Sequence, residues 1–187
     1  MIKRIFDFSV TLILLFIVAL PMVIITAAIH LTSRGPALHW SERVGKNNII
    51  FKMPKFRTMC LDAPDLPTHL MKNAQDYMTP LGNILRLTSL DELPQFWSVL
   101  KGDMSLVGPR PALHNQDDLI TLRTEKKIHK LTPGITGWAQ INGRDEISIL
   151  EKVALDEYYM QNQSFWLDMS ILWRTLLKVV KKENISH

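Results

Sequence analysis

A long apolar run near the N-terminus constrains this chain more than any other feature. The twenty residues from Val10 to Ile29 carry no charge, and a helix needs about 20 apolar residues to cross the hydrocarbon core of a bilayer. A cleaved signal peptide fits less well, because its apolar region is usually only about 7 to 15 residues long. We therefore expect the run to be retained and to lie in a membrane.

Pro21 and the charges around the run bear on how it meets the membrane. Pro21 lies near the centre of the run, where proline removes a helical hydrogen bond. Positive residues flank both ends, namely Lys3 and Arg4 before the run and Arg34, Arg43 and Lys46 after it. A straight span would place one of these clusters on the outer face, against the positive-inside tendency, whereas a break near Pro21 returns both ends to the cytoplasm. The charges favour a re-entrant helix-break-helix over residues 1–32, with a straight span as the alternative.

The rest of the chain, residues 33–187, is predicted to form one small mixed α+β domain that is mostly helical. We expect extended segments over residues 37–46 and 49–59, and helices over 116–130, 147–159 and 165–182. The last helix gathers basic residues on one side and carries Trp166 and Trp173. This pattern is typical of an amphipathic helix at a membrane surface, and a packed core helix with one wet face explains it equally well.

Composition narrows the cellular setting but not the partner. Hydrophobic residues make up 47% of the chain, and a mean hydropathy of +0.04 is too apolar for a wholly soluble protein. The net charge of +4 and the isoelectric point near 9.2 suit nucleic acid, an anionic membrane or a phosphorylated substrate alike. Cys60 is the single cysteine, so no internal disulfide forms and a reducing, cytoplasmic setting is the simpler inference. The histidines lack the spacing of zinc ligands.

Two adjacent carboxylates stand out in the segment Leu87–Gln95. Asp91 and Glu92 follow two hydroxyl residues, and Ser89 stands before Glu92 in the S-x-x-E spacing of a capping box. A helix that begins here and continues to Leu100 would hold both carboxylates at the positive end of its dipole, where they stay ionised and where phosphates bind. On these residues alone, a plain helix cap and a catalytic pair fit equally well.

Three basic motifs are typical of anion binding. Lys55 and Arg57 alternate with Phe56, so an extended segment would present both cations from one face, either to an anion or to solvent. Arg110 stands between two prolines, which restrict the backbone on both sides and display its guanidinium rigidly. The segment from 133 to 144 contains three glycines, which permit close approach of a ligand, and ends at Arg144, which could close on a phosphate.

Together these motifs resemble the bacterial small monotopic phosphoglycosyl transferases, from about residue 3 to about residue 182. The resemblance is carried by Lys55–Met59, Ser89–Gln95, Lys101–Ser105, Val107–Pro111 and Gly134–Gln140. It implies transfer of a sugar 1-phosphate from a UDP-sugar to polyprenol (undecaprenyl) phosphate at the cytoplasmic face of the bacterial inner membrane, among its lipids and with no nucleic acid partner. The family's membrane helix breaks at a Ser-Pro pair, whereas this chain has Leu20-Pro21 and lacks that hydroxyl.

The resemblance also implies roles for particular residues. Asp91 would attack the sugar-bearing phosphorus, expel UMP and hold the phosphosugar as an aspartyl ester until the lipid takes it, which is covalent catalysis by a carboxylate. Glu92, alone or together with Asp91, would bind Mg2+, the expected cofactor. The implied phosphate-binding residues are Arg110 and Arg144 and, less directly, Arg86, Lys55 and Arg57. Asp156 lies in a segment that recurs in the family, and the sequence suggests no role for it.

The same residues are compatible with two alternatives. In one, direct transfer in a ternary complex replaces the covalent intermediate. In the other, the chain is a non-enzymatic, membrane-anchored scaffold whose carboxylates cap a helix and whose arginines hold anionic lipid headgroups. No motif names the sugar, the glycoconjugate pathway or the oligomeric state.

Overall fold

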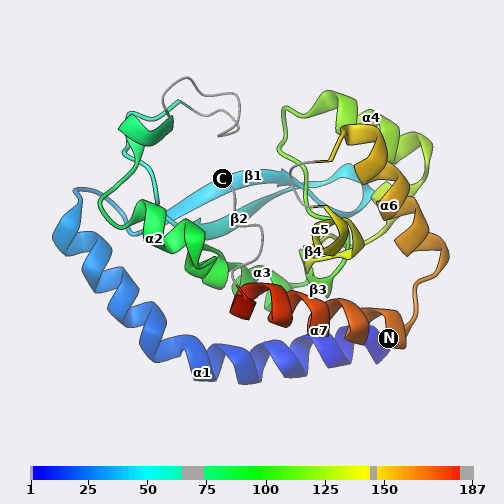
Figure 1. The fold of residues 1–187 in the computed structure, drawn as a ribbon, viewed down its shortest axis with the longest axis horizontal. Helices are drawn as coiled ribbons and strands as arrows, with labels where there is room; N and C mark the ends of the chain where they lie inside the picture. Colours follow the sequence, from blue (N-terminus) through cyan, green and yellow to red (C-terminus); the bar gives the residue numbers. More distant parts are fainter. Residues whose placement is uncertain (1, 65–73, 144–146, 182–187) are drawn as a thin grey trace.

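The computed structural model describes residues 2–64, 74–143 and 147–181, and Figure 1 shows a mostly helical body around two small sheets. This confirms the predicted mixed α+β class. In chain order the helices and strands are α1 (Ile2–Thr32), β1 (Leu38–Val44), β2 (Ile50–Phe56), α2 (Gly82–Leu87), α3 (Phe96–Lys101), β3 (Ser105–Val107), α4 (Asp117–Glu125), β4 (Gly134–Thr136), α5 (Trp138–Asn142), α6 (Ile149–Gln161) and α7 (Phe165–Lys181). Short 3-10 turns lie between them, namely η1 (Lys46–Asn48), η3 (Ala74–Tyr77), η4 (Leu90–Gln95) and η5 (Ile128–Lys130).

α1 is a single curved helix. Its helical residues continue through Pro21 without interruption, so the predicted helix-break-helix does not form. Proline removes one hydrogen bond and bends a helix, but the bonds on either side keep the residues helical. The ribbon curves along one edge of the body, from the N-terminus towards β1 (Figure 1). Within the described part of the chain, α1 is the one helix long and apolar enough to cross a membrane by length and composition.

The first two turns of α1 are held by polar contacts with the body. Asp7 is only 3% exposed, and its carboxylate accepts a hydrogen bond from Ser105 Oγ at 2.7 Å. Lys3 Nζ lies 2.6 Å from Asp168 Oδ2 on α7. Arg4 donates to the carbonyls of Val99 and Leu100 in the last turn of α3. The charged residues at the start of α1 therefore belong to the folded body.

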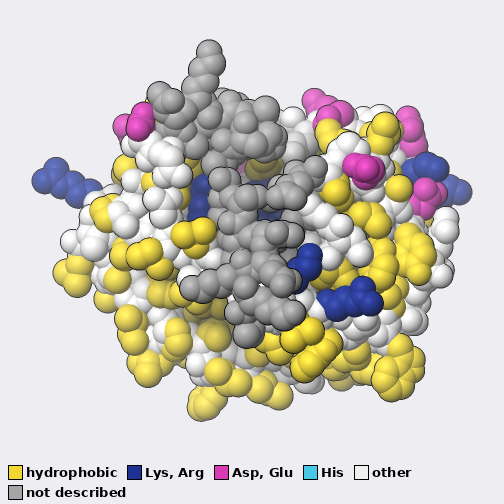
Figure 2. Space-filling model, viewed as in Figure 1, with side chains coloured by type: hydrophobic (Ala, Val, Ile, Leu, Met, Phe, Trp, Pro, Cys, Tyr) yellow, Lys and Arg dark blue, Asp and Glu magenta, His cyan; other side chains and the backbone are white. Residues whose placement is uncertain are grey.

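The C-terminal end of α1 rests on the same body. Ile29 is 1% exposed and lies in an apolar cluster with Phe56 of β2 and Leu85 of α2. Between the two anchored ends, apolar side chains such as Phe16 and Leu20 are 87% and 69% exposed. Figure 2 shows hydrophobic side chains along the lower edge of the molecule, where Figure 1 places α1 and α7.

The two sheets are small, and they differ in strand direction. β1 and β2 form an antiparallel hairpin in which Leu38 pairs with Phe56 and Val44 with Ile50, which confirms the two predicted extended segments. β3 and β4 are parallel, with Val107 opposite Thr136. Because the carboxyl ends of parallel strands meet at one edge, the segments that follow β3 and β4 begin side by side.

Glycines let the turn after β3 pack closely against both ends of β4. A Cβ atom on Gly134 would overlap the backbone nitrogen of Gly108, and one on Gly137 would overlap the Gly108 carbonyl oxygen. The sequence predicts that glycines here let a ligand approach the backbone. In the structure, these glycines instead allow two segments of the chain's own backbone to touch.

The main core lies between α3, β3, α6 and α7. Val99, Tyr159 and Ile171 are each at most 1% exposed and belong to one apolar cluster. α7 contributes Ile171 to this cluster, whereas its Trp166 and Trp173 are 80% and 62% exposed. One face of α7 is therefore packed, and another presents aromatic side chains outwards.

Candidate active site

Ser89 directly precedes η4, the short turn that contains Asp91 and Glu92. It has φ +55°, in the left-handed region that few non-glycine residues adopt, and its side chain makes no capping hydrogen bond. The predicted capping box between Ser89 and Glu92 therefore does not form. A capping residue typically has an extended backbone with negative φ, and Ser148, with φ −59° and ψ 159°, forms a capping box with Glu151 at the start of α6. Asp91 and Glu92 lie in η4, a 3-10 turn that leads directly into α3.

The carboxyl group of Asp91 is buried among other charges. Asp91 is 8% exposed, and burial is the main cause that raises its pKa from 3.8 to about 6. The negative charge of Glu92 raises this pKa further, whereas the positive charges of Lys55, Arg86 and Arg110 oppose the rise. A titratable group shifted by burial and by specific charged neighbours is typical of a functional site.

Glu92 faces the arginine that follows β3. Arg110 Nη2 lies 2.6 Å from Glu92 Oε1, and the two side chains stay 42% and 25% exposed. Ion pairs with this much exposure contribute only about 0 to 1 kcal/mol. An ion pair of this kind would cost little free energy to break if a phosphate took the place of Glu92 at the guanidinium. The arginine that the sequence places between two prolines lies at the site.

Lys55 and Arg86 bring two more cations to the same place, from β2 and α2. Burial lowers the pKa of Lys55 from 10.5 to about 8, the charge of Arg43 lowers it further, and the charge of Asp91 opposes the fall. Burial also lowers the pKa of Arg86, whose Nε donates to Thr58 Oγ1 at 3.0 Å. Sequence reasoning counts Arg43 only as a flanking charge and misses its place beside Lys55.

One predicted anion ligand lies elsewhere in the fold. Arg57 is 5% exposed, and its guanidinium donates to the Pro36 carbonyl at 2.7 Å and to Ser33 Oγ at 2.9 Å. Ser33 and Pro36 belong to the turn that follows α1, so Arg57 holds this turn against the end of β2. The alternation predicts that Lys55 and Arg57 lie on one face, but only Lys55 lies at the site. β2 ends at Phe56, so Arg57 stands outside the strand. Arg144 lies outside the described residues.

Asp156 is buried on α6 and pairs with Arg123 of α4. The carboxylate is 1% exposed, and Arg123 Nη2 lies 2.6 Å from its Oδ2. The sequence predicts a helix over residues 116–130, and α4 forms within that range, but sequence reasoning misses the burial of Arg123. The available signal is spacing, because Arg123 stands four residues after Leu119 and the two share the buried face of α4.

Asp91 and Glu92 fit a Mg2+ site that substrate would complete. Mg2+ is usually held by one or two carboxylates together with phosphate oxygens and water. The repulsion from Glu92 that raises the pKa of Asp91 is a cost that a divalent cation beside both groups would offset. Within residues 2–64, 74–143 and 147–181, no three His, Cys, Asp or Glu side chains gather into a metal-binding group. Phosphate oxygens and water are the usual remaining ligands of a Mg2+ ion held by two carboxylates.

The family comparison matches residues 1–182 to the bacterial sugar transferase family. The sugar transferase EpsL of Bacillus subtilis is 42% identical over 187 residues, which cover 99% of this chain and 90% of EpsL. The undecaprenyl-phosphate glucose phosphotransferase of Komagataeibacter xylinus is 39% identical over 97% of this chain and 36% of that protein. The UDP-glucose:undecaprenyl-phosphate glucose-1-phosphate transferase of Klebsiella pneumoniae is 39% identical over 94% of this chain and 39% of that protein.

This chain spans most of EpsL and a little over a third of the other two relatives. The matched residues include the whole charged cluster, which we define as Lys55, Arg86, Asp91, Glu92 and Arg110. The chain belongs to the bacterial sugar transferase family, as its resemblance to phosphoglycosyl transferases predicts, and it is an enzyme of that class.

Proposed function

We propose that this protein transfers a sugar 1-phosphate from a UDP-sugar to polyprenol phosphate, giving polyprenol-diphosphate-sugar and UMP. The observation that carries the proposal is the buried carboxyl group of Asp91, on which the charges of Lys55, Arg86 and Arg110 act. Fixed cations around a nucleophile suit attack on a diphosphate, because they stabilise the negative charge of the transferred group. The names of the two longer relatives, which specify undecaprenyl phosphate, support the same reaction.

The reaction consists of two displacements at one phosphorus atom. First, a carboxylate oxygen of Asp91 attacks the phosphorus that carries the sugar, the bond from that phosphorus to UMP breaks, and UMP leaves with the bonding electrons. Second, a phosphate oxygen of the polyprenol phosphate attacks the same phosphorus, and Asp91 leaves as a free carboxylate. With a pKa of about 6, Asp91 is mostly ionised at neutral pH and needs no separate base.

The neighbouring charges have separate tasks in this scheme. Arg110 exchanges its contact with Glu92 for the diphosphate, and Lys55 and Arg86 neutralise charge on the phosphate oxygens as UMP departs. Glu92, together with Asp91, would hold Mg2+, which when bound supplies further neutralisation of the phosphate oxygens.

Residues 1–32 enter the membrane and return to the same face, with residues 33–187 on the cytoplasmic side. This topology is supported by the anchoring of both ends of α1, through Asp7 and Ser105 at one end and Ile29 and Phe56 at the other. A spanning helix would put its ends on opposite sides of a core about 30 Å thick, and both ends pack against one body. The exposed apolar edge of α1 and α7 would then lie in lipid (Figure 2). The rest of the domain would rest on the membrane surface, where the acceptor's phosphate lies.

Release of UMP tests the proposed reaction. The full chain in nanodiscs is incubated with UDP-glucose, UDP-galactose and UDP-N-acetylgalactosamine, the sugars that relatives suggest. Each is assayed with and without polyprenol phosphate and Mg2+. We expect turnover that requires both. Absence of UMP release with a broad panel of UDP-sugars would favour the scaffold alternative.

Isotope exchange separates the covalent route from direct transfer. An aspartyl intermediate forms before the lipid binds, so labelled UMP should enter the UDP-sugar without any acceptor, and Asp91→Asn should abolish this exchange. A direct transfer gives no exchange in the absence of polyprenol phosphate. Lys126→Ala is a suitable control, because Lys126 pairs with Glu157 at 3.2 Å on the surface, outside the charged cluster.

A further inference from the structure

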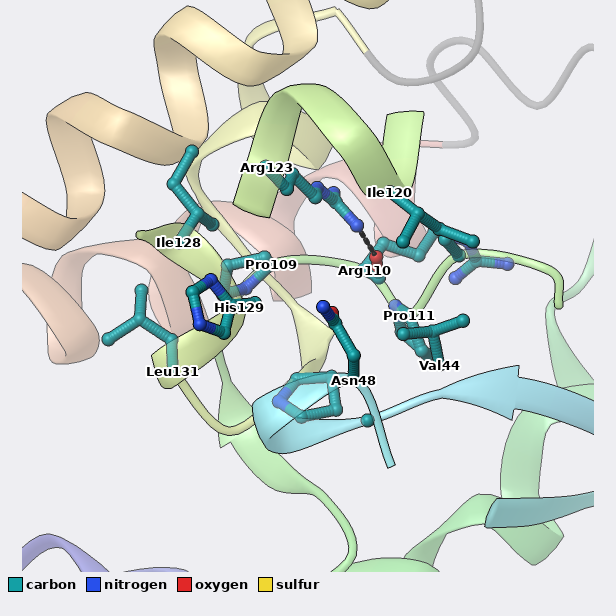
Figure 3. Close-up of a pocket in the computed structure, with 13 residues that line it drawn as sticks. Val44, Asn48, Pro109, Arg110, Pro111, Ile120, Arg123, Ile128, His129 and Leu131 are labelled. Atoms are coloured by element: carbon teal, nitrogen blue, oxygen red, sulfur yellow. Dashed lines mark hydrogen bonds between the residues drawn. The ribbon is translucent and has the colours of Figure 1, made fainter. Parts of the chain in front are cut away.

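Arg123 joins a buried carboxylate to the backbone of Arg110. Its Nε and Nη2 donate to Asp156 Oδ2 at 3.0 and 2.6 Å, and its Nη1 donates to the Arg110 carbonyl at 2.8 Å. Figure 3 shows the Arg123 guanidinium directed at this carbonyl in the wall of a small pocket, while the Arg110 side chain extends away. At its far end the same Arg110 side chain meets Glu92 at 2.6 Å.

The segment Pro109–Pro111 is held along its whole length. Its three successive carbonyls accept hydrogen bonds from the Gly134 N–H at 2.9 Å, from Arg123 at 2.8 Å and from Arg43 at 3.4 Å. The two prolines fix their own φ angles and restrict the residue that precedes each of them. The contact from Arg123 is the one that acts on the peptide of Arg110 itself, and so on the direction of its side chain.

The Asp156 and Arg123 pair is poorly explained as a device for stability. Taking two charges out of water costs about as much as their attraction returns, so buried ion pairs are weak evidence of stabilisation. Burial raises the pKa of Asp156 despite the opposing charge of Arg123, which reflects this cost. The pair instead fixes an orientation. A planar guanidinium held by a carboxylate can direct its remaining N–H groups at a third group, here the Arg110 carbonyl.

We propose that Asp156 and Arg123 are positioning residues, which hold the Arg110 backbone so that its guanidinium lies at Glu92 and the substrate phosphates. The inference rests on the proposed phosphoryl transfer for its effect on rate, whereas the placement of Arg110 is measurable without turnover. Misplacing a catalytic group by about 1 Å can cost about 100-fold in rate. A change at Arg123 should therefore reduce activity through Arg110, without any contact between Arg123 and substrate.

Arg123→Lys tests this in the full chain. Lysine keeps a positive charge beside Asp156, but its ammonium does not reproduce the guanidinium fork that meets both the carboxylate and the carbonyl. We expect kcat/KM for UMP release to fall about 10- to 100-fold. The loss should be distributed between a lower kcat and a higher KM in the same proportion as in Arg110→Ala. In an Arg110→Ala background, the same substitution should change kcat/KM by less than about twofold, because the group that it positions is gone.

Lys126→Ala is the matched control. Lys126, directly after α4, pairs with Glu157 on α6, so this ion pair joins the same two helices but does not involve the segment Pro109–Pro111. It should change kcat/KM by less than about twofold in either background. If Arg123→Lys causes the same loss in both backgrounds, its role is structural and the proposal is overturned. Full activity of Arg123→Lys overturns it as well.

A second measurement reads the placement of Arg110 directly. In the full chain with isotope-labelled arginine, the Arg110 Nε–H resonance is assigned by its loss in Arg110→Ala. It should shift or broaden in Arg123→Lys and stay unchanged in Lys126→Ala. An unmoved resonance overturns the positioning role whether or not UMP is released. A moved resonance in a protein that never releases UMP overturns the proposed function and leaves the positioning of Arg110 supported.

Discussion

Lys55 on β2 and Asp91 on η4 have pKa values that the same cause moves towards each other. Burial lowers the pKa of Lys55 to about 8 and raises that of Asp91 to about 6, and each charge opposes the shift of the other. Both groups are charged only between these two values. The state with an ionised carboxylate beside an ammonium therefore occupies a window around neutral pH.

UMP release should follow a bell-shaped pH profile. Asp91 must be ionised to attack and Lys55 protonated to neutralise phosphate charge, so kcat/KM should rise with pH through about 6 and fall through about 8. The charges of Glu92, Arg86 and Arg110 also act on Asp91, so the limbs report the cluster as a whole. Lys55→Arg should move the alkaline limb to higher pH, because a guanidinium keeps its proton. A profile that is flat through the acid range would contradict the role of Asp91.

Asp91→Asn should abolish transfer and stabilise the fold. The native pKa of about 6 exceeds the ordinary value of 3.8, so the folded protein binds more protons between them and loses stability as Asp91 ionises. Above about pH 6 the neutral amide should raise the free energy of unfolding by about 1 to 3 kcal/mol. This gain should disappear as the pH falls below about 4. Thermal unfolding of both proteins across this range checks the prediction, and an equal gain at all pH values would contradict it.

Glu92→Gln should weaken the response to Mg2+. Loss of a carboxylate ligand should raise the Mg2+ concentration needed for half-maximal UMP release by at least about 10-fold. Arg110→Ala serves as the comparison, because it should raise KM for the UDP-sugar more than the Mg2+ requirement. Glu157→Gln, on the surface of α6, should alter neither quantity. An unchanged Mg2+ titration in Glu92→Gln would remove this residue from the metal site.

Arg57→Ala and Arg86→Ala should have different effects, although both residues are predicted anion ligands. Arg57 is buried against the turn after α1, so its loss should lower the free energy of unfolding by about 1 to 3 kcal/mol and leave KM for the UDP-sugar unchanged. Arg86 acts on Asp91, and its loss should raise that KM. Thermal unfolding and initial rates distinguish the two. A raised KM in a stably folded Arg57→Ala protein would restore Arg57 to the substrate site.

Both ends of α1 should face the cytoplasm. In a Cys60→Ser background, Ile2→Cys and Arg34→Cys place single thiols beside the two ends of the helix, and Ile2 is 79% exposed. A membrane-impermeant thiol reagent should label both positions in inverted vesicles and neither in intact cells. Labelling of Ile2→Cys in intact cells would show that α1 spans the membrane.

The features that could be predicted from the sequence depend on rules that act over a few residues. The apolar run, the two extended segments and the helices of the last forty residues follow from hydrophobic pattern and turn residues. Asp91, Glu92 and Arg110 could be named because two adjacent carboxylates and an arginine between prolines are visible in the chain itself. The structure brings Arg110 to 2.6 Å from Glu92 and brings the charges of Lys55 and Arg86 to act on Asp91.

The features that could not be predicted depend on distant partners. Asp7 meets Ser105 across 98 positions, and Arg123 meets Asp156 across 33. Lys55 and Arg57 have the same charge and stand two residues apart, yet one reaches the site and the other binds the turn after α1. Lys55 and Arg57 have different partners because each side chain pairs with the polar groups that the packing of helices and strands brings near it.

The sequence by itself determined which residues carry charge, where the apolar surface lies and which two carboxylates are neighbours. Tertiary structure alone decided which charges are buried together, that α1 bends without breaking and is anchored at both ends, and that Arg110 is braced by Arg123. The physical reason is that pairing and pKa depend on distance and on exclusion of water. Both are set by the packing of segments that lie far apart in the chain.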